Sequence, residues 1–149
     1  MITVLVDRLL KSAQLDLTHG IEWTINSPIN INRVGVAIRN GIDETNEGFG
    51  DGWSYRVDMN KEDDYHLARI VYFINHPEEI KGVEVDNVIV ADRYHCSVMP
   101  NAKITDGHHR LMAAKHLDLE KIDIRYGGRS DILDYLTGDS DSEPTNMLA

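Results

Sequence analysis

The sequence predicts a mixed α/β domain, because stretches with helical periodicity alternate with stretches rich in β-branched residues. Three observations carry this prediction. The run of β-branched residues from Val83 to Val90 is typical of a central strand. Residues 103–117 combine a short strand pattern with an apolar helical pattern, and residues 121–126 again have the composition of a strand. We therefore expect a small mixed sheet flanked by helices.

The N-terminal segment is expected to form a helix followed by strands. Apolar residues between positions 4 and 13 fall on one helical face, which predicts a helix over Val4–Ala13 with Thr3 as its N-cap. Valines in this segment also allow a strand. Apolar residues alternate with others over residues 29–38, and the turn signal Asn40-Gly41 follows, so we expect one or two strands there.

The next segment is expected to form a loop and then a second helix. Residues 41–53 include three glycines at alternate positions and predict a surface loop, and residues 54–58 predict a short strand. Asn60 can cap the helix that follows, with acidic residues in its first turn as the helix dipole prefers. The expected buried stripe of that helix is Leu67, Ile70, Val71 and Ile74.

The remaining elements alternate between strand and helix. Lys103–Thr105 predicts a short strand, and a helix is expected from Gly107 to about Leu117. Lys121–Tyr126 predicts the next strand. Ser130 can cap a last helix, and Gly138 is expected to end it.

Length and composition predict one domain with a tail. The chain has 149 residues, and no linker-like stretch divides it, so we expect a single domain over residues 1–138 with its motif core at 83–126. The tail, residues 139–149, is polar and acidic and is expected to be disordered. No apolar run is long enough to cross a bilayer, and the single Cys96 excludes an internal disulfide. We therefore expect a cytoplasmic protein with no membrane partner.

The charge balance indicates which kinds of partner the chain can bind. With 15 basic and 25 acidic residues the net charge is -10, which argues against strong binding of duplex DNA. Residues 101–130 are the exception, because six basic residues there outnumber four acidic ones. A small basic region in an acidic protein suits a compact anion. The alternative is that these residues only form the solvated faces of helices.

The segment Asp106-Gly107-His108-His109-Arg110 has the composition of a phosphate-binding helix start. Asp106 is a good N-cap, and Gly107 allows the backbone to approach a ligand closely. The two histidines and Arg110 fall in the first turn, where free N–H groups and the helix dipole favour an anion. Cationic side chains are unfavourable at this end unless an anion binds. The alternative is a helix cap with exposed histidines.

Other candidate sites are weaker. Arg129 follows a Gly-Gly turn and could add a second anion contact, although a simple turn capped by Ser130 explains the rest of that segment. The spacing of the possible zinc ligands does not predict a structural zinc site. These ligands are His95, Cys96, His108, His109 and His116. A Mg²⁺ ion that arrives with a nucleotide needs only one or two carboxylates, for which Asp106 and Asp92 are candidates.

Residues 83–126 resemble the core of the ParB/sulfiredoxin superfamily, whose members have a strand, a short Gly-x-x-Arg or Asp-Gly-His-His-Arg segment, an Ala-rich helix and a strand. Here Ile104 to Leu117 and Ile122–Ile124 match that plan. The resemblance implies a single ParB/sulfiredoxin-like domain. In partition proteins of the superfamily the segment binds CTP phosphates. Sulfiredoxins use ATP and a catalytic cysteine, whose place His108 takes here, so sulfinic acid repair is not expected.

The resemblance implies ATP or CTP with Mg²⁺ as the cofactor, and phosphoryl transfer or nucleotide hydrolysis as the reaction, as in the free serine kinases of the superfamily. From the residues and the resemblance together we expect catalytic roles for Asp106, His108 and His109, with Asp106 also at the metal. The resemblance carries phosphate contacts onto His109 and Arg110, and the residue patterns described above add Gly107 and Arg129. Two alternatives stay open. One is a regulatory module that binds a protein partner through its acidic surface, and the other is a Mg²⁺-dependent ParB-like nuclease.

Overall fold

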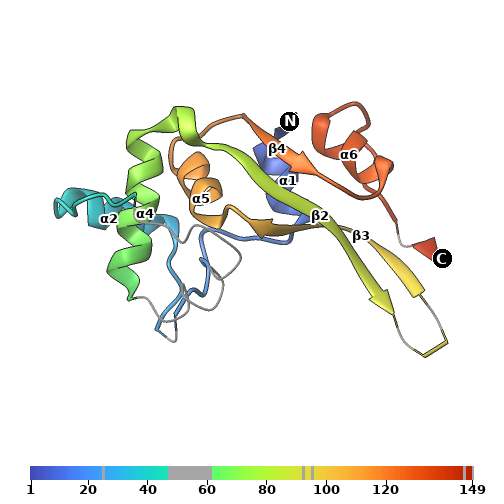
Figure 1. The fold of residues 1–149 in the computed structure, drawn as a ribbon, viewed down its shortest axis with the longest axis horizontal. Helices are drawn as coiled ribbons and strands as arrows, with labels where there is room; N and C mark the ends of the chain where they lie inside the picture. Colours follow the sequence, from blue (N-terminus) through green and yellow to red (C-terminus); the bar gives the residue numbers. More distant parts are fainter. Residues whose placement is uncertain (25, 47–61, 92, 95, 146, 149) are drawn as a thin grey trace. The chain divides into compact units, whose positions relative to one another are not determined.

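The computed structural model describes residues 1–24, 26–46, 62–91, 93–94, 96–145 and 147–148. The chain divides into two compact units. The sheet unit consists of Met1–Leu15, Lys81–His108 and Leu119–Ala149, and the helical unit consists of Asp16–Ile80 and His109–Asp118. The predicted mixed α/β class is confirmed (Figure 1). The described helices include none with both the length and the apolar character needed to cross a membrane.

The sheet unit contains a five-stranded mixed sheet with the order β1-β4-β2-β3-β5. Its strands are β1 (Ile2–Leu5), β2 (Lys81–Ala91), β3 (Cys96–Asp106), β4 (Lys121–Tyr126) and β5 (Met147–Leu148). β2 is the central strand, antiparallel to β3 and parallel to β4. The β1–β4 and β3–β5 pairs are antiparallel. The small mixed sheet and the central position of β2 are therefore both as the sequence predicts.

Strand β2 alternates between core and solvent where it lies inside the sheet. Val83 and Val85 are buried, while Glu84 is exposed, as the period of two in a strand requires. Toward its end the strand leaves the core, and Ile89 and Val90 are 62% and 53% exposed. In Figure 1 the outer parts of β2 and β3 form a two-stranded ribbon that extends beyond the rest of the sheet.

Two helices complete the sheet unit. The predicted helix over residues 4–13 is wrong in its first turn, because Ile2–Leu5 pairs with β4 and α1 covers only Val6–Ser12. β-branched residues favour the strand here, and Thr3 bonds the Asp123 carboxylate across the sheet instead of capping a helix. Helix α6 (Ser130–Thr137) ends at Gly138, whose φ of 88° is left-handed, as the sequence predicts.

The helical unit contains α2 (Ile31–Arg39), α4 (Asp63–Asn75) and the 3-10 turn η1 (Pro77–Glu79). The strands predicted over residues 29–38 are wrong. The Asn30 side chain accepts a hydrogen bond from the Arg33 backbone N–H at 2.9 Å, and this cap starts α2. Val34 and Ala37 then face the core at helical spacing.

Helix α4 confirms the second predicted helix, with Asp63 and Asp64 in its first turn and most of the expected stripe buried. Its N-cap residue is Glu62. The proposed cap Asn60, the predicted loop at 47–53 and the predicted strand at 54–58 lie outside the described residues.

The C-terminal tail makes contacts with β3 and with α1. Met147 and Leu148 pair with β3. Asp141 forms an ion pair with Arg8 at 2.5 Å, and Glu143 forms one with Lys11. The acidic residues of the tail thus bind basic residues of α1, an interaction that composition alone does not reveal.

Candidate functional site

The predicted phosphate-binding segment lies where β3 passes into α5 (His108–His116). Asp106 is the last residue of β3, and Gly107 separates it from the helix. The predicted N-cap at Asp106 is therefore displaced by one residue. Gly107 has a φ of 107°, and a Cβ there would lie 3.0 Å from Cγ2 of Val83. Because glycine has no side chain, the backbone can adopt this φ and pack closely against Val83 of β2.

Asp106 has a second carboxylate beside it in the sheet. Its partner across the β2–β3 ladder is Glu84, which pairs on its other side with Arg125 of β4. Residues directly opposite one another in a ladder point to the same face. Glu84 was not among the predicted site residues, because strand pairing is needed to place it beside Asp106.

His108 differs from the expected basic group. Burial lowers the pKa of its imidazole, and the charge of Asp106 opposes that effect without cancelling it. His108 is consequently neutral at neutral pH. One of the three groups that the sequence placed as cations in the first turn therefore carries no charge there.

The His109 side chain is held in place by ring stacking and by a contact with a second histidine. Its ring stacks on Trp23 with 4.5 Å between centroids and 5° between planes. Its Nε2 lies 3.0 Å from Nδ1 of His66, which is fully buried in α4. Trp23 also stacks on His66 at 5.1 Å, and Tyr65 meets both imidazoles edge-on. All four residues belong to the helical unit.

The contact between the two imidazoles has a chemical consequence. A hydrogen bond between His66 and His109 requires a proton on one nitrogen and a lone pair on the other, so each ring fixes the tautomer of its partner. The sequence analysis did not identify His66 or Trp23. The only available signal was a histidine beside Leu67 in the apolar stripe of α4.

The loop that carries Trp23 is tied to the start of α4. Thr24 donates to the Asp63 carboxylate at 2.6 Å, and Arg33 donates to it at 2.7 Å. Burial would raise the pKa of Asp63, but hydrogen bonds from Thr24, Arg33 and Asn26 outweigh burial and lower it. Asp63 therefore stays ionised and holds together the loop and the helix that position Trp23 and His66.

Arg110 supplies the permanent positive charge of the segment. Its guanidinium carbon lies 6.0 Å from the centre of the Phe73 ring of α4, within the helical unit. A guanidinium remains protonated at all physiological pH values and offers forked donors that match a phosphate. The next residue, Leu111, is fully buried and anchors the helix behind the arginine.

Arg129 has a structural role that the sequence prediction did not include. Nε and Nη2 donate to Asp131, Nη1 donates to the Val98 carbonyl at 2.9 Å, and Nη2 also donates to the Thr145 carbonyl at 2.7 Å. The side chain is only 10% exposed. These contacts join β3, α6 and the tail, so they do not support the predicted phosphate contact. Ser130 is the first residue of α6, and Arg129 holds the N-cap position.

The predicted metal ligands are not gathered in a cluster. Within the described parts of the chain, Asp106, His108, His109 and His116 do not belong to any group of three or more convergent His, Cys, Asp or Glu side chains. Asp92 and His95 lie outside the described residues. The expectation that no structural zinc site forms from these residues stays a prediction.

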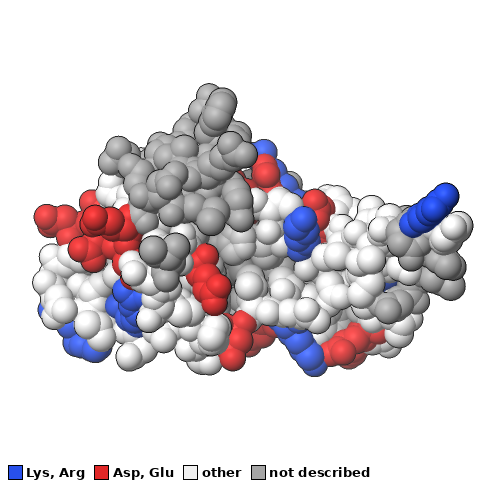
Figure 2. Space-filling model, turned by 90° about the horizontal axis from the view of Figure 1, so that it is seen from below, with Lys and Arg blue, Asp and Glu red and all other residues white. Residues whose placement is uncertain are grey.

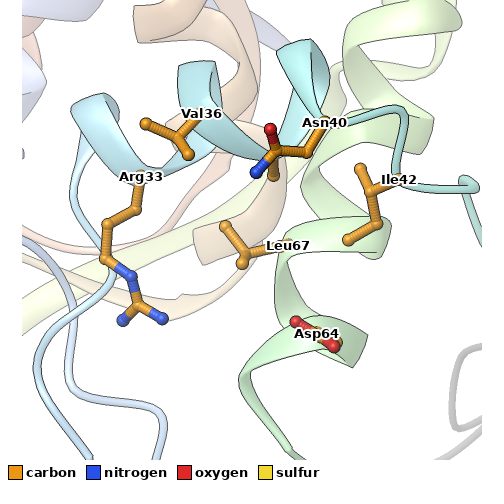
Figure 3. A pocket seen from close by; sticks show the side chains of 7 residues that line it. Arg33, Val36, Asn40, Ile42, Asp64 and Leu67 are labelled. Carbon is orange, nitrogen blue, oxygen red and sulfur yellow. The ribbon is translucent and has the colours of Figure 1, made fainter.

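A pocket of about 380 Å³ lies between α2 and α4 in the helical unit. Figure 3 shows Arg33 on α2, Asn40 directly after that helix, and Asp64 and Leu67 on α4 around the pocket. Arg33 is committed to Asp63, as described above. The pocket is lined by none of the residues predicted from the sequence to form the site, and we assign it to the packing between the two helices.

The surface charge agrees with the sequence analysis. On the face shown in Figure 2, Lys and Arg side chains are scattered among Asp and Glu side chains, and the described residues form no broad basic area there. A duplex polyanion needs many neighbouring cations, whereas a compact phosphate needs few.

Comparison with protein-family models, curated proteins and solved structures finds no match for this chain. What the chain does must therefore be inferred from the chemistry of Asp106–Arg110 and of the side chains that hold it.

Proposed function

We propose that the chain binds the phosphate groups of a nucleotide, ATP or CTP, at the start of α5, as a protein of the ParB/sulfiredoxin type. The observation that carries the proposal is the environment of His109. A histidine in the first turn of a helix, held by Trp23 and by the buried His66, stands next to the permanent cation of Arg110. Such a fixed arrangement is more typical of an anion-binding site than of a helix cap with exposed histidines.

Different residues bind the phosphate and accept the proton in the proposed reaction. Backbone N–H groups of the first turn and the forked donors of Arg110 bind phosphate oxygens. The His66–His109 pair accepts the proton of an attacking hydroxyl group or water during phosphoryl transfer or hydrolysis. His108, which is neutral, contributes its backbone N–H and packing and not a charge. Arg129 is not part of the proposed site, because its donors hold other groups.

The donor set fits a magnesium ion that arrives with the nucleotide. Asp106 and its ladder partner Glu84 are two carboxylate residues opposite one another in the β2–β3 ladder. Mg²⁺ is commonly held by one or two carboxylates together with phosphate oxygens. When bound, the ion would neutralise phosphate charge. Asp106 and Glu84 would hold it, while Arg125 offsets part of their repulsion when no ion is bound.

The test follows the melting temperature with ATP and CTP, each with and without Mg²⁺. A ligand at one hundred times its dissociation constant adds about 2.7 kcal/mol of stability. We expect this shift with at least one nucleotide and its loss in Arg110→Ala. Arg39→Ala, which changes an exposed arginine at the end of α2, should retain the shift. An unchanged shift in a folded Arg110→Ala, or no shift with either nucleotide, would contradict the proposal.

A protein-interaction module is the second candidate function, and one observation favours it. Ile89, Val90 and Tyr94 are 62%, 53% and 78% exposed toward the end of the β2–β3 hairpin. Exposed apolar side chains that lie together mark interaction surfaces, and these three residues belong to the same hairpin. Steady nucleotide turnover by the purified chain alone would count against this function as the main one. No comparable observation on the described residues favours the nuclease alternative.

A further inference from the structure

A cluster of possible metal ligands lies at the C-terminal end of α4, within the helical unit. His76 follows the helix, and Glu78 and Glu79 lie in η1. One ligand atom from each of the three side chains lies within 4.8 Å of the others. Pro77, the first residue of η1, fixes its own φ and stiffens the turn that carries both glutamates.

The contacts of His76 show what its ring faces. Its Nε2 lies 3.1 Å from a carboxylate oxygen of Glu44, which is within hydrogen-bond distance. Its Nδ1 lies 3.7 Å from a carboxylate oxygen of Glu78, which is too long for a hydrogen bond. If Nε2 carries a proton and donates it in a hydrogen bond to Glu44, Nδ1 has a lone pair. That lone pair then faces a lone pair of the Glu78 carboxylate oxygen. A cation between the two atoms would remove that repulsion.

Two further contacts orient the same side chains. The Tyr72 ring stacks on His76 with 4.4 Å between centroids. The Tyr72 hydroxyl donates to one carboxylate oxygen of Glu79 and leaves the other oxygen available. Residues that bind metal ions are characteristically held in this way by outer partners, and a metal-bound histidine typically gives its other N–H to a carboxylate.

The local charge also favours a cation. Three carboxylates, those of Glu44, Glu78 and Glu79, surround one imidazole. Among the described residues, Arg69 is a positive group beside Tyr72. Its guanidinium lies 5.6 Å from the Tyr72 ring centre and 4.8 Å from that of Phe73 and donates to Asn46. The three carboxylates therefore outnumber this described arginine.

We propose that His76, Glu78 and Glu79 bind a divalent transition metal ion, with Glu44 and Tyr72 as the outer partners that orient the ligands. One imidazole nitrogen and two carboxylate oxygens are a donor set that Zn²⁺ accepts, with water completing the coordination. The ion ties the end of α4 and the η1 turn to the segment that carries Glu44. This site is separate from the proposed nucleotide site and does not depend on it.

The experiment titrates the full-length chain, freed of metal by a chelator, with Zn²⁺ by isothermal titration calorimetry, and with Co²⁺ by visible absorption. We expect one tight site in the unmodified chain. His76→Ala should abolish that site, and Glu44→Gln should weaken it by roughly 10-fold or more, as loss of an outer partner does in other metal sites. His19→Ala removes an exposed histidine of the same unit and should leave binding unchanged.

Each result bears on the site directly. Equal Zn²⁺ binding by the unmodified chain and by His76→Ala would place the ion on other histidines and overturn the proposal. The absence of Zn²⁺ binding by the unmodified chain would also overturn the proposal. If circular dichroism shows that His76→Ala is unfolded, Glu79→Gln takes its place, and the same loss of the site is required.

Discussion

His108 shows how one partly buried side chain links pH to stability. Burial lowers its folded pKa below the ordinary value of 6.5, so the unfolded chain binds protons more strongly at acid pH. The stability lost through this group therefore grows as the pH falls below 6.5. When the pH falls from about 7.5 to about 5.5, the unfolding free energy of both proteins should decrease. We expect the decrease to be smaller in His108→Gln than in the unmodified chain. Urea unfolding at the two pH values measures the difference, and equal losses would contradict the assignment.

His66 is the residue whose replacement should disturb the candidate site most. His66→Ala removes a fully buried ring, the hydrogen bond to His109 and one side of the Trp23 stack. Loss of a buried partner together with a cavity should decrease the unfolding free energy by about 2–4 kcal/mol. His19→Ala, an exposed change, should stay within about 0.5 kcal/mol. Equal urea midpoints for the two variants would show that the imidazole pair does not hold the unit.

At the scale of elements, the connection between β3 and α5 depends on Gly107. Alanine there would have to adopt a φ of 107° and would press its Cβ against Val83. We expect Gly107→Ala to cost about 1–3 kcal/mol of unfolding free energy. Gly127 offers the matched control, because a Cβ there meets nothing within 4 Å. Thermal or urea unfolding compares the two variants, and similar stabilities would mean that the turn relaxes more easily than its geometry implies.

The success of the sequence analysis also differs between elements. β2 and β4 are predicted almost to their ends, since runs of β-branched residues carry their own strand preference. Helix α2 was missed because its apolar residues satisfy a period of two as well as a helical period. The hydrogen bond from the Arg33 N–H to the Asn30 side chain marks the start of the helix. β1 was missed because its partner, β4, lies far away in sequence.

The site was predictable only where it is local in sequence. The segment Asp106–Arg110 stands out as five consecutive residues, and the structure places it at the start of a helix as expected. His66 and Trp23 lie 43 and 86 positions before His109 and reach it only through the packing of the helical unit. The observed contacts of Arg129 could not be predicted for a related reason, because the carbonyls that accept from its guanidinium belong to β3 and to the tail.

For the whole molecule, the net charge of -10 and the small basic segment favour a compact anion over a long polyanion.

The central claim is that a nucleotide binds through its phosphates to the start of α5. Isothermal titration calorimetry of ATP and CTP in Mg²⁺, with the unmodified chain, Arg110→Ala and Arg39→Ala, tests it most directly. We predict one binding site per chain for at least one nucleotide, unchanged in Arg39→Ala and weakened by at least about tenfold, or about 1.4 kcal/mol, in Arg110→Ala. Equal affinity in a folded Arg110→Ala, or no heat of binding with either nucleotide, would contradict the claim.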